Sequence, residues 1–168
     1  MEKEKTSLED ILRSTNENET AKEILRIINL ASVFLSIYTF LYLIINLLIR
    51  DIWLGVRAAL IVAIPFLLVT LVRLLVKAPR PIEIFDFYGA DAKKKNSHSF
   101  PSRHAFSAFA IGVLALFFHF TLGLITVALA ALMSVSRVFL GKHVPRDVIA
   151  GGLIGIISSL LGYFIFIL

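Results

Sequence analysis

The residues best suited to chemistry in this 168-residue chain are two histidines, an aspartate and several arginines beyond residue 72. Arginine side chains carry planar donor forks that match the oxygens of a phosphate group. A histidine paired with a carboxylate has a fixed tautomer and a more basic free nitrogen, which suits a nucleophile. The candidates fall in four short stretches: Arg73, Lys77 and Arg80; Ser102, Arg103 and His104; Ser136 and Arg137; and His143, Arg146 and Asp147.

The segments between these candidates are strongly apolar. Hydrophobic residues make up 58% of the chain and the mean hydropathy is +0.85, whereas an average soluble domain has about 45–50% apolar residues. The uncharged run Ile28–Ile49 spans roughly 33 Å at about 1.5 Å per residue, enough to cross the hydrocarbon core. The pattern predicts an all-α, polytopic transmembrane bundle with about five spans: Ile28–Ile49, Trp53–Val76, His104–Phe120, Thr121–Leu140 and Val148–Leu168.

The chain divides into a polar N-terminal segment and a membrane domain. The third span is short, so we expect it to be tilted or shielded by its neighbours. Residues 1–27 are polar and of mixed charge, and we expect a separate N-terminal segment that forms a short amphipathic helix. Residues 28–168 form the predicted membrane domain. Gly151 and Gly155 make a small-xxx-small pair that is typical of a helix-packing contact. The absence of cysteine excludes a thiol nucleophile and a cysteine-based metal site.

The alternation of the spans brings the four polar stretches to one membrane face. Consecutive spans run in opposite directions, so the end of the second, the start of the third, the end of the fourth and the start of the fifth lie together. Cations at helix ends usually extend to the lipid headgroups, which accounts for Lys77, Lys142 and the run Lys93-Lys94-Lys95. It does not account for two histidines and an aspartate in the same layer. We therefore predict one phosphate-sized anion site at this face.

Local spacing suggests a role for each member of the site. Ser102 precedes an apolar run and is expected to be a helix N-cap, which points backbone N–H groups at a bound anion. Pro145 suits the first turn of a helix, leaving His143 just before it, with Asp147 within reach of the imidazole. His104 is then a second, acid–base histidine. A metal site is the competing interpretation, and we disfavour it because the nearby arginines would repel a divalent cation.

The same residues resemble three motifs of the type 2 phosphatidic acid phosphatase (PAP2) superfamily, which includes the vanadium haloperoxidases. Ser136-Arg137-x5-His143-x3-Asp147 resembles the third motif. Phe100-Pro101-Ser102-Arg103-His104 resembles the second, and Arg73-x6-Arg80-Pro81 the first. The resemblance covers roughly Leu54–Leu168, and the polar N-terminus lies outside it.

The resemblance implies a role for each matched position. His143 becomes the nucleophile that forms a phosphohistidine, Asp147 its orienting partner, and His104 the acid that protonates the leaving oxygen. It also implies that no metal or other cofactor is needed. The resemblance places Arg73, Arg80, Ser102 and Arg137 on the phosphoryl oxygens. From their positions in the sequence, we also expect Arg103 to be a phosphate ligand, and Lys77 and Ser136 to be auxiliary residues.

Three features depart from the family pattern. Arg73 replaces the usual lysine, which keeps the charge but changes the donor geometry, and Lys77 lies one turn along the same helix. Arg103 replaces the usual glycine and adds a bulky cation beside the phosphate. Five spans, rather than the common six, put the N-terminus on the same side as the site.

The sequence therefore predicts an integral-membrane lipid phosphatase acting on a phosphomonoester or diphosphate. Phosphatidic acid, phosphatidylglycerophosphate and polyprenyl phosphates or diphosphates are all candidate substrates. The alternatives are a lipid phosphotransferase and a non-catalytic protein that binds or transports anionic lipids. We expect the partners to be the lipid phosphate and membrane lipids, and no nucleic acid.

The family resemblance and the distribution of positive charge predict opposite orientations of the site in the membrane. The resemblance implies the extracytoplasmic face of the cell membrane, and we adopt this expectation. The positive-inside rule favours the cytoplasm, because the opposite face holds only Arg50 and Arg57. Cations without an assigned phosphate role on the site's face are Lys3, Lys5, Arg13, Lys22, Arg26, Lys77, Lys93, Lys94, Lys95, Lys142 and Arg146.

Overall fold

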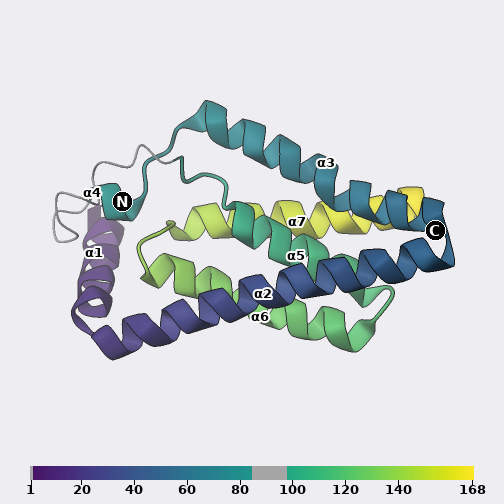
Figure 1. Cartoon of the computed structure of the whole chain (residues 1–168). Coiled ribbons are helices and arrows are strands. Elements are labelled where there is room, and N and C mark those ends of the chain that lie inside the picture. The colour runs from purple at the N-terminus through teal and green to yellow at the C-terminus, as the bar shows by residue number, and fades with distance from the viewer. Residues whose placement is uncertain (1, 85–97) are drawn as a thin grey trace.

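The computed structural model describes residues 2–84 and 98–168. Its long helices reverse direction from one to the next and together form a bundle (Figure 1). The described residues contain no strand, and the predicted all-α class is confirmed. The run Lys93-Lys94-Lys95 lies outside them. The helices are α1 (Glu2–Glu17), α2 (Glu19–Arg50), α3 (Ile52–Val76), α4 (Pro81–Ile84), α5 (Arg103–Leu116), α6 (Phe120–Phe139) and α7 (Pro145–Phe166).

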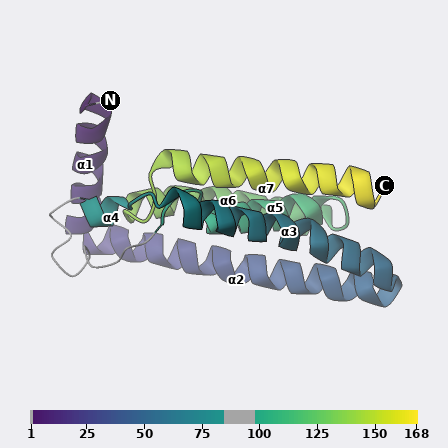
Figure 2. The same cartoon turned by 90° about the horizontal axis from the view of Figure 1, so that it is seen from above.

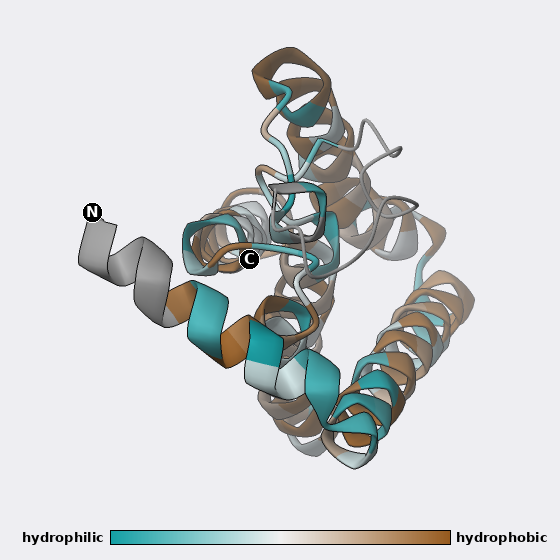
Figure 3. Ribbon diagram, turned by 90° about the vertical axis from the view of Figure 1, so that its left-hand side faces the viewer, coloured by the Kyte–Doolittle hydropathy of each residue, from teal (hydrophilic) through white to brown (hydrophobic). Residues whose placement is uncertain are grey.

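The length and surface of the bundle fit a lipid environment. By length and composition, α2, α3, α6 and α7 could each cross a membrane. Large apolar side chains point outward, including Phe34, Leu67 and Ile165, and the outer faces of the bundle are hydrophobic in Figure 3. An exposed apolar belt of this size is stable only against lipid or another apolar surface. The chain is an integral membrane protein.

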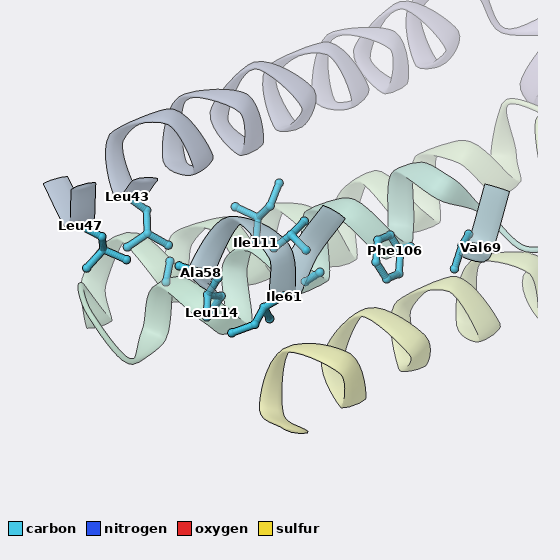
Figure 4. Close-up of a cluster of buried hydrophobic side chains, with 11 residues drawn as sticks. Leu43, Leu47, Ala58, Ile61, Val69, Phe106, Ile111 and Leu114 are labelled. Atoms are coloured by element: carbon cyan, nitrogen blue, oxygen red, sulfur yellow. The ribbon is translucent and has the colours of Figure 1, made fainter. Parts of the chain in front are cut away.

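Helix α5 is the short third span and lies at the centre of the bundle. It has 14 residues, nine of which are buried, and it packs against α2, α3, α6 and α7. The expectation that neighbours shield this span is confirmed. Figure 4 shows part of the contact, where Phe106, Ile111 and Leu114 of α5 meet an apolar cluster with α2 and α3.

The N-terminal polar segment contains α1 and the first turns of α2. Helix α2 begins at Glu19, well before the apolar run at Ile28, because the Asn18 side chain caps it by accepting from Ala21 N at 3.0 Å. Helix α1 lies across the end of the bundle instead of along it (Figures 2 and 3). Its Leu12 is fully buried there.

Polar side chains join the helices inside the bundle. Thr39 and Thr126 share a hydrogen bond of 2.9 Å between α2 and α6, and Ser159 of α7 donates to the Ala110 carbonyl of α5 at 2.8 Å. Lipid tails are as apolar as leucine, so van der Waals packing and hydrogen bonds of this kind hold membrane helices together.

Two glycines of α7 let that helix approach α5 closely. A Cβ atom built on Gly151 would overlap the backbone oxygen of Ser102, and one on Gly155 would overlap the backbone oxygen of Phe106. The predicted packing role of this pair is confirmed. Because the Gly151 contact falls at Ser102, it also sets how close the starts of α5 and α7 come.

We predict that Gly155→Ala lowers the free energy of unfolding by about 1–3 kcal/mol, as expected for overpacking against backbone. Thermal unfolding in detergent measures the effect. Gly152→Ala is the matched control, because the atoms nearest to its Cβ belong to the side chain of Phe109, the closest at 3.0 Å, and not to the backbone. Equal midpoints for the two variants would contradict the packing role of Gly155.

Candidate active site

The predicted residues gather at the end of the bundle that α1 crosses. The end of α3, the start of α5, the end of α6 and the start of α7 all lie on this side of the bundle (Figure 1). Arg73 lies close enough to Arg80, Arg103 and Asp147 to interact with them electrostatically. His104 interacts in the same way with Arg137 and His143. One cluster therefore contains residues from all four polar stretches.

His143 and Asp147 form a buried pair at the start of α7. Nδ1 of His143 lies 3.4 Å from Oδ2 of Asp147, and the two side chains are 1% and 0% exposed. Pro145 occupies the first turn of α7 as predicted. The same carboxylate oxygen accepts from Val144 N at 3.4 Å, which fixes its position. Since a carboxylate only accepts, Nδ1 of His143 carries the proton.

The contact with Arg137, on the other side of the ring, indicates the same tautomer. Nη2 of Arg137 lies 3.4 Å from Nε2 of His143. A guanidinium has donors only, so Nε2 presents its lone pair. Burial lowers the pKa of His143, an effect that Asp147 opposes and Arg137 reinforces. Burial therefore favours the neutral imidazole, with its Nε2 lone pair directed at the guanidinium of Arg137.

Arg137 is held by a residue of another helix. Its Nη1 donates to Oδ1 of Asn29 on α2 at 3.1 Å, and its side chain is buried. Its Nε is buried without a hydrogen-bond partner among the described residues, as is Nε of Arg80. Buried donors without a partner are rare in folded proteins, and a role in catalysis or ligand binding is one explanation for them. Both are suited to receive an anion.

Arg73 anchors the segment that leads into α5. Its Nη1 donates to the carbonyl groups of Ser99 and Pro101, each at 3.2 Å. Ser99 in turn donates from its backbone N to the Ala78 carbonyl at 2.7 Å. The buried Arg73 thus ties the end of α3 to the residues just before Ser102.

Ser102 and its neighbours begin α5. Ser102 is the N-cap, as predicted, with Oγ accepting from Ala105 N at 3.5 Å. Its backbone N donates to the Asp147 carbonyl at 2.9 Å, which joins the starts of α5 and α7. Arg103 is half-buried and His104 is exposed. Both line a cavity of about 340 Å³ that continues past Phe66 and Ile111 between α2, α3 and α5.

Two auxiliary candidates lie apart from these contacts. Lys77 ends α3 in the left-handed conformation, with φ of 48°, and is exposed. Ser136 is fully buried, and its hydroxyl donates to the Met133 carbonyl of its own helix at 2.8 Å. That bond gives Ser136 a structural partner within α6.

Asn29 and Ser99 were not predicted to be part of the site. Asn29 lies inside a predicted span, and the signal available was an amide near the start of an otherwise apolar run. Ser99 contributes a backbone carbonyl to Arg73, and no side-chain pattern indicates such a contact.

The chain belongs to the PAP2 superfamily, because a family model with that description matches residues 54–167, more than half of its length. Two curated relatives match over shorter stretches. Bacitracin transport permease protein BcrC of Bacillus licheniformis is 43% identical over 63 residues, 38% of this chain and 31% of that protein. Lipid A 4'-phosphatase of Bacteroides thetaiotaomicron is 36% identical over 80 residues, 46% of this chain and 36% of that protein. The matched regions span about a third of each relative's length.

Two solved structures resemble this one. A transmembrane PAP2 type phosphatidylglycerolphosphate phosphatase from Bacillus subtilis has a TM-score of 0.74 at 20% identity, over 98% of this chain and 86% of that chain. At this identity the likeness shows the fold alone. Aquifex aeolicus LpxE has a TM-score of 0.59 at 26% identity, over 84% of this chain and 93% of that chain.

We predict that Asn29→Leu weakens binding of orthovanadate, a phosphate analogue, by about tenfold, because a hydrogen bond to a charged group is lost. Calorimetric titration in detergent measures the affinity. Asn46→Leu is the matched control, since the Asn46 amide donates to the Tyr42 carbonyl of its own helix at 2.8 Å. Unchanged affinity in Asn29→Leu would show that Asn29 does not position Arg137.

Proposed function

We propose that the protein is a membrane lipid phosphatase that works through a phosphohistidine on His143. The observation that carries the proposal is the buried His143, held between Asp147 and Arg137 with its Nε2 lone pair toward the guanidinium. A neutral, oriented imidazole beside an anion-binding fork suits attack on phosphorus. Membership of the PAP2 superfamily supports the same reaction.

The proposed reaction has two steps, formation of the phosphohistidine and its hydrolysis. Nε2 of His143 attacks phosphorus, the bond from phosphorus to the lipid oxygen breaks, and His104 gives that oxygen a proton. Water then attacks the phosphorus atom while His104 takes a proton from that water. The bond from phosphorus to Nε2 breaks, which frees His143 and releases inorganic phosphate. Asp147 stabilises the charge that develops on the imidazole. The proposed phosphate ligands are Arg73, Arg80, Ser102, Arg103 and Arg137, with Lys77 and Ser136 as auxiliary residues.

The substrate we propose is a lipid phosphomonoester or diphosphate. The cavity beside Arg103 and His104 passes from charged to apolar residues, including Ile37 and Phe66, as an amphipathic ligand requires. Phosphatidic acid, phosphatidylglycerophosphate and polyprenyl phosphates or diphosphates all fit this description. The Bacillus subtilis protein of similar structure is named as a phosphatidylglycerolphosphate phosphatase. The Bacteroides thetaiotaomicron relative is named as a lipid A 4'-phosphatase.

A second candidate function is the binding or transport of an anionic lipid. One relative is named for transport, in its case of bacitracin. Binding alone does not require a histidine oriented by a carboxylate. Release of phosphate that depends on His143 distinguishes the phosphatase from the transporter. Transfer to an acceptor other than water would instead yield a new phosphorylated product.

We predict that His143→Ala abolishes phosphate release from a panel of purified lipid phosphates, measured in detergent. His104→Ala should slow release least for substrates with good leaving groups. Asp147→Asn should lower the rate by about 10²–10⁴, as in other enzymes with an oriented histidine. Persistent release in His143→Ala would contradict the assigned nucleophile.

We predict that activity is independent of divalent metals. Arginines stand where Mg²⁺ neutralises charge in other phosphoryl-transfer enzymes. A chelator should therefore leave the rate unchanged, and vanadate should inhibit. Activity that a chelator removes and one particular metal restores would disprove this proposal.

We also propose that the protein lies in the cell membrane with its site outside the cytoplasm. The chain has no native cysteine, so single cysteines report on each end of the bundle. An impermeant reagent applied to intact cells should label Thr20→Cys, at the site's end, and leave Arg50→Cys, at the other end, unlabelled. The reverse pattern would show that the charge bias sets the orientation.

A further inference from the structure

A second group of cations lies beside the catalytic cluster, in a pocket of about 270 Å³. We call it the basic pocket. It forms where α1 ends, α2 begins and α6 passes into α7. Lys22, Arg26 and Lys142 line it, together with Thr15, Asn16 and the end of α6. None of the three cations has an assigned role in the reaction.

The positive charge of Lys142 has no acidic partner in the described part of the chain. Burial lowers the pKa of Lys142, and the nearby charges of Arg137, Arg26 and Arg80 lower it further, with no carboxylate acting against them. Carboxylates near the other two cations lie on the surface of α2. Lys22 pairs with Glu19 at 2.8 Å and Arg26 with Glu23 at 3.3 Å. Both carboxylates are exposed, at 77% and 62%, and ion pairs that reach the surface contribute little to stability. The pocket therefore favours an anion.

The basic pocket shares a backbone turn with the catalytic residues. Lys142 and His143 both donate from their backbone N to the Arg137 carbonyl, at 3.0 and 3.3 Å. Lys142 also interacts electrostatically with His104. A group bound in the pocket would therefore lie next to the phosphate on which His143 acts.

We propose that the basic pocket binds a second lipid-attached phosphate group beside the one that is hydrolysed. This inference rests on the proposed function for the first phosphate. The second group is either the other phosphate of a diphosphate substrate or the headgroup phosphate of a neighbouring anionic lipid. Cations that merely extend into the headgroup layer attract anionic lipids in general, wherever they lie on the bundle, and would not distinguish a diphosphate from a monophosphate.

The test measures binding directly, so it does not depend on turnover. In the full chain carrying His143→Ala, in a neutral detergent, a polyprenyl diphosphate and the monophosphate of the same chain length are titrated separately. The His143→Ala chain should bind the diphosphate about tenfold more tightly than the monophosphate. Adding Lys22→Gln and Arg26→Gln should remove this preference. Lys142 is left intact because it adjoins His143.

A second arm detects a neighbouring lipid. With vanadate saturating the catalytic site of the otherwise unmodified chain, native mass spectrometry counts bound phosphatidylglycerol. Lys22→Gln with Arg26→Gln should lower the count if the neighbour is the source. Arg50→Gln, at the far end of the bundle, is the control for loss of a cation. Equal thermal midpoints exclude a folding defect.

The outcomes separate the two sources. A lost preference for the diphosphate assigns the pocket to the substrate, and a lost phosphatidylglycerol molecule assigns it to a neighbouring lipid. If neither changes, the proposal is wrong, even if the chain releases phosphate. If the lipid panel shows no phosphate release, the proposed function fails while the binding results still decide whether the pocket holds a phosphate.

Discussion

The site depends on one imidazole ring that is held from both sides. Asp147 accepts from one ring nitrogen of His143 and Arg137 donates toward the other. Because one neighbour only accepts and the other only donates, the tautomer is fixed without reference to a substrate. Burial keeps the ring neutral by penalising its charged form. The lone pair then faces the place where arginine would hold a phosphate.

This arrangement requires four helix ends to meet at one level of the bundle. Gly151 lets the starts of α5 and α7 come together, and the hydrogen bond from Ser102 N to the Asp147 carbonyl fixes their register. Arg73 ties the preceding segment to the end of α3. Buried hydrogen bonds elsewhere in the bundle also hold the helices in position, since lipid provides no hydrophobic drive for helix association.

Much of this could be predicted from sequence because its signals are local. Apolar length predicted the spans, and residue spacing predicted the Ser102 cap, the position of Pro145 and the pairing of His143 with Asp147. The start of α2 was not predicted, since hydropathy reports lipid contact and not helix continuity. Asn29 was missed because its contact joins residues more than a hundred positions apart. Only packing in three dimensions brings such a pair together.

The most direct test of the account is to trap the phosphoenzyme. The chain is mixed briefly with a lipid phosphate labelled in its phosphoryl group and quenched in alkali, which preserves phosphohistidine. Mass spectrometry of the peptides then locates the label. The account predicts a single phosphorylated residue, His143. A label on another residue, or turnover with no covalent label under conditions where its formation outpaces its hydrolysis, would contradict it.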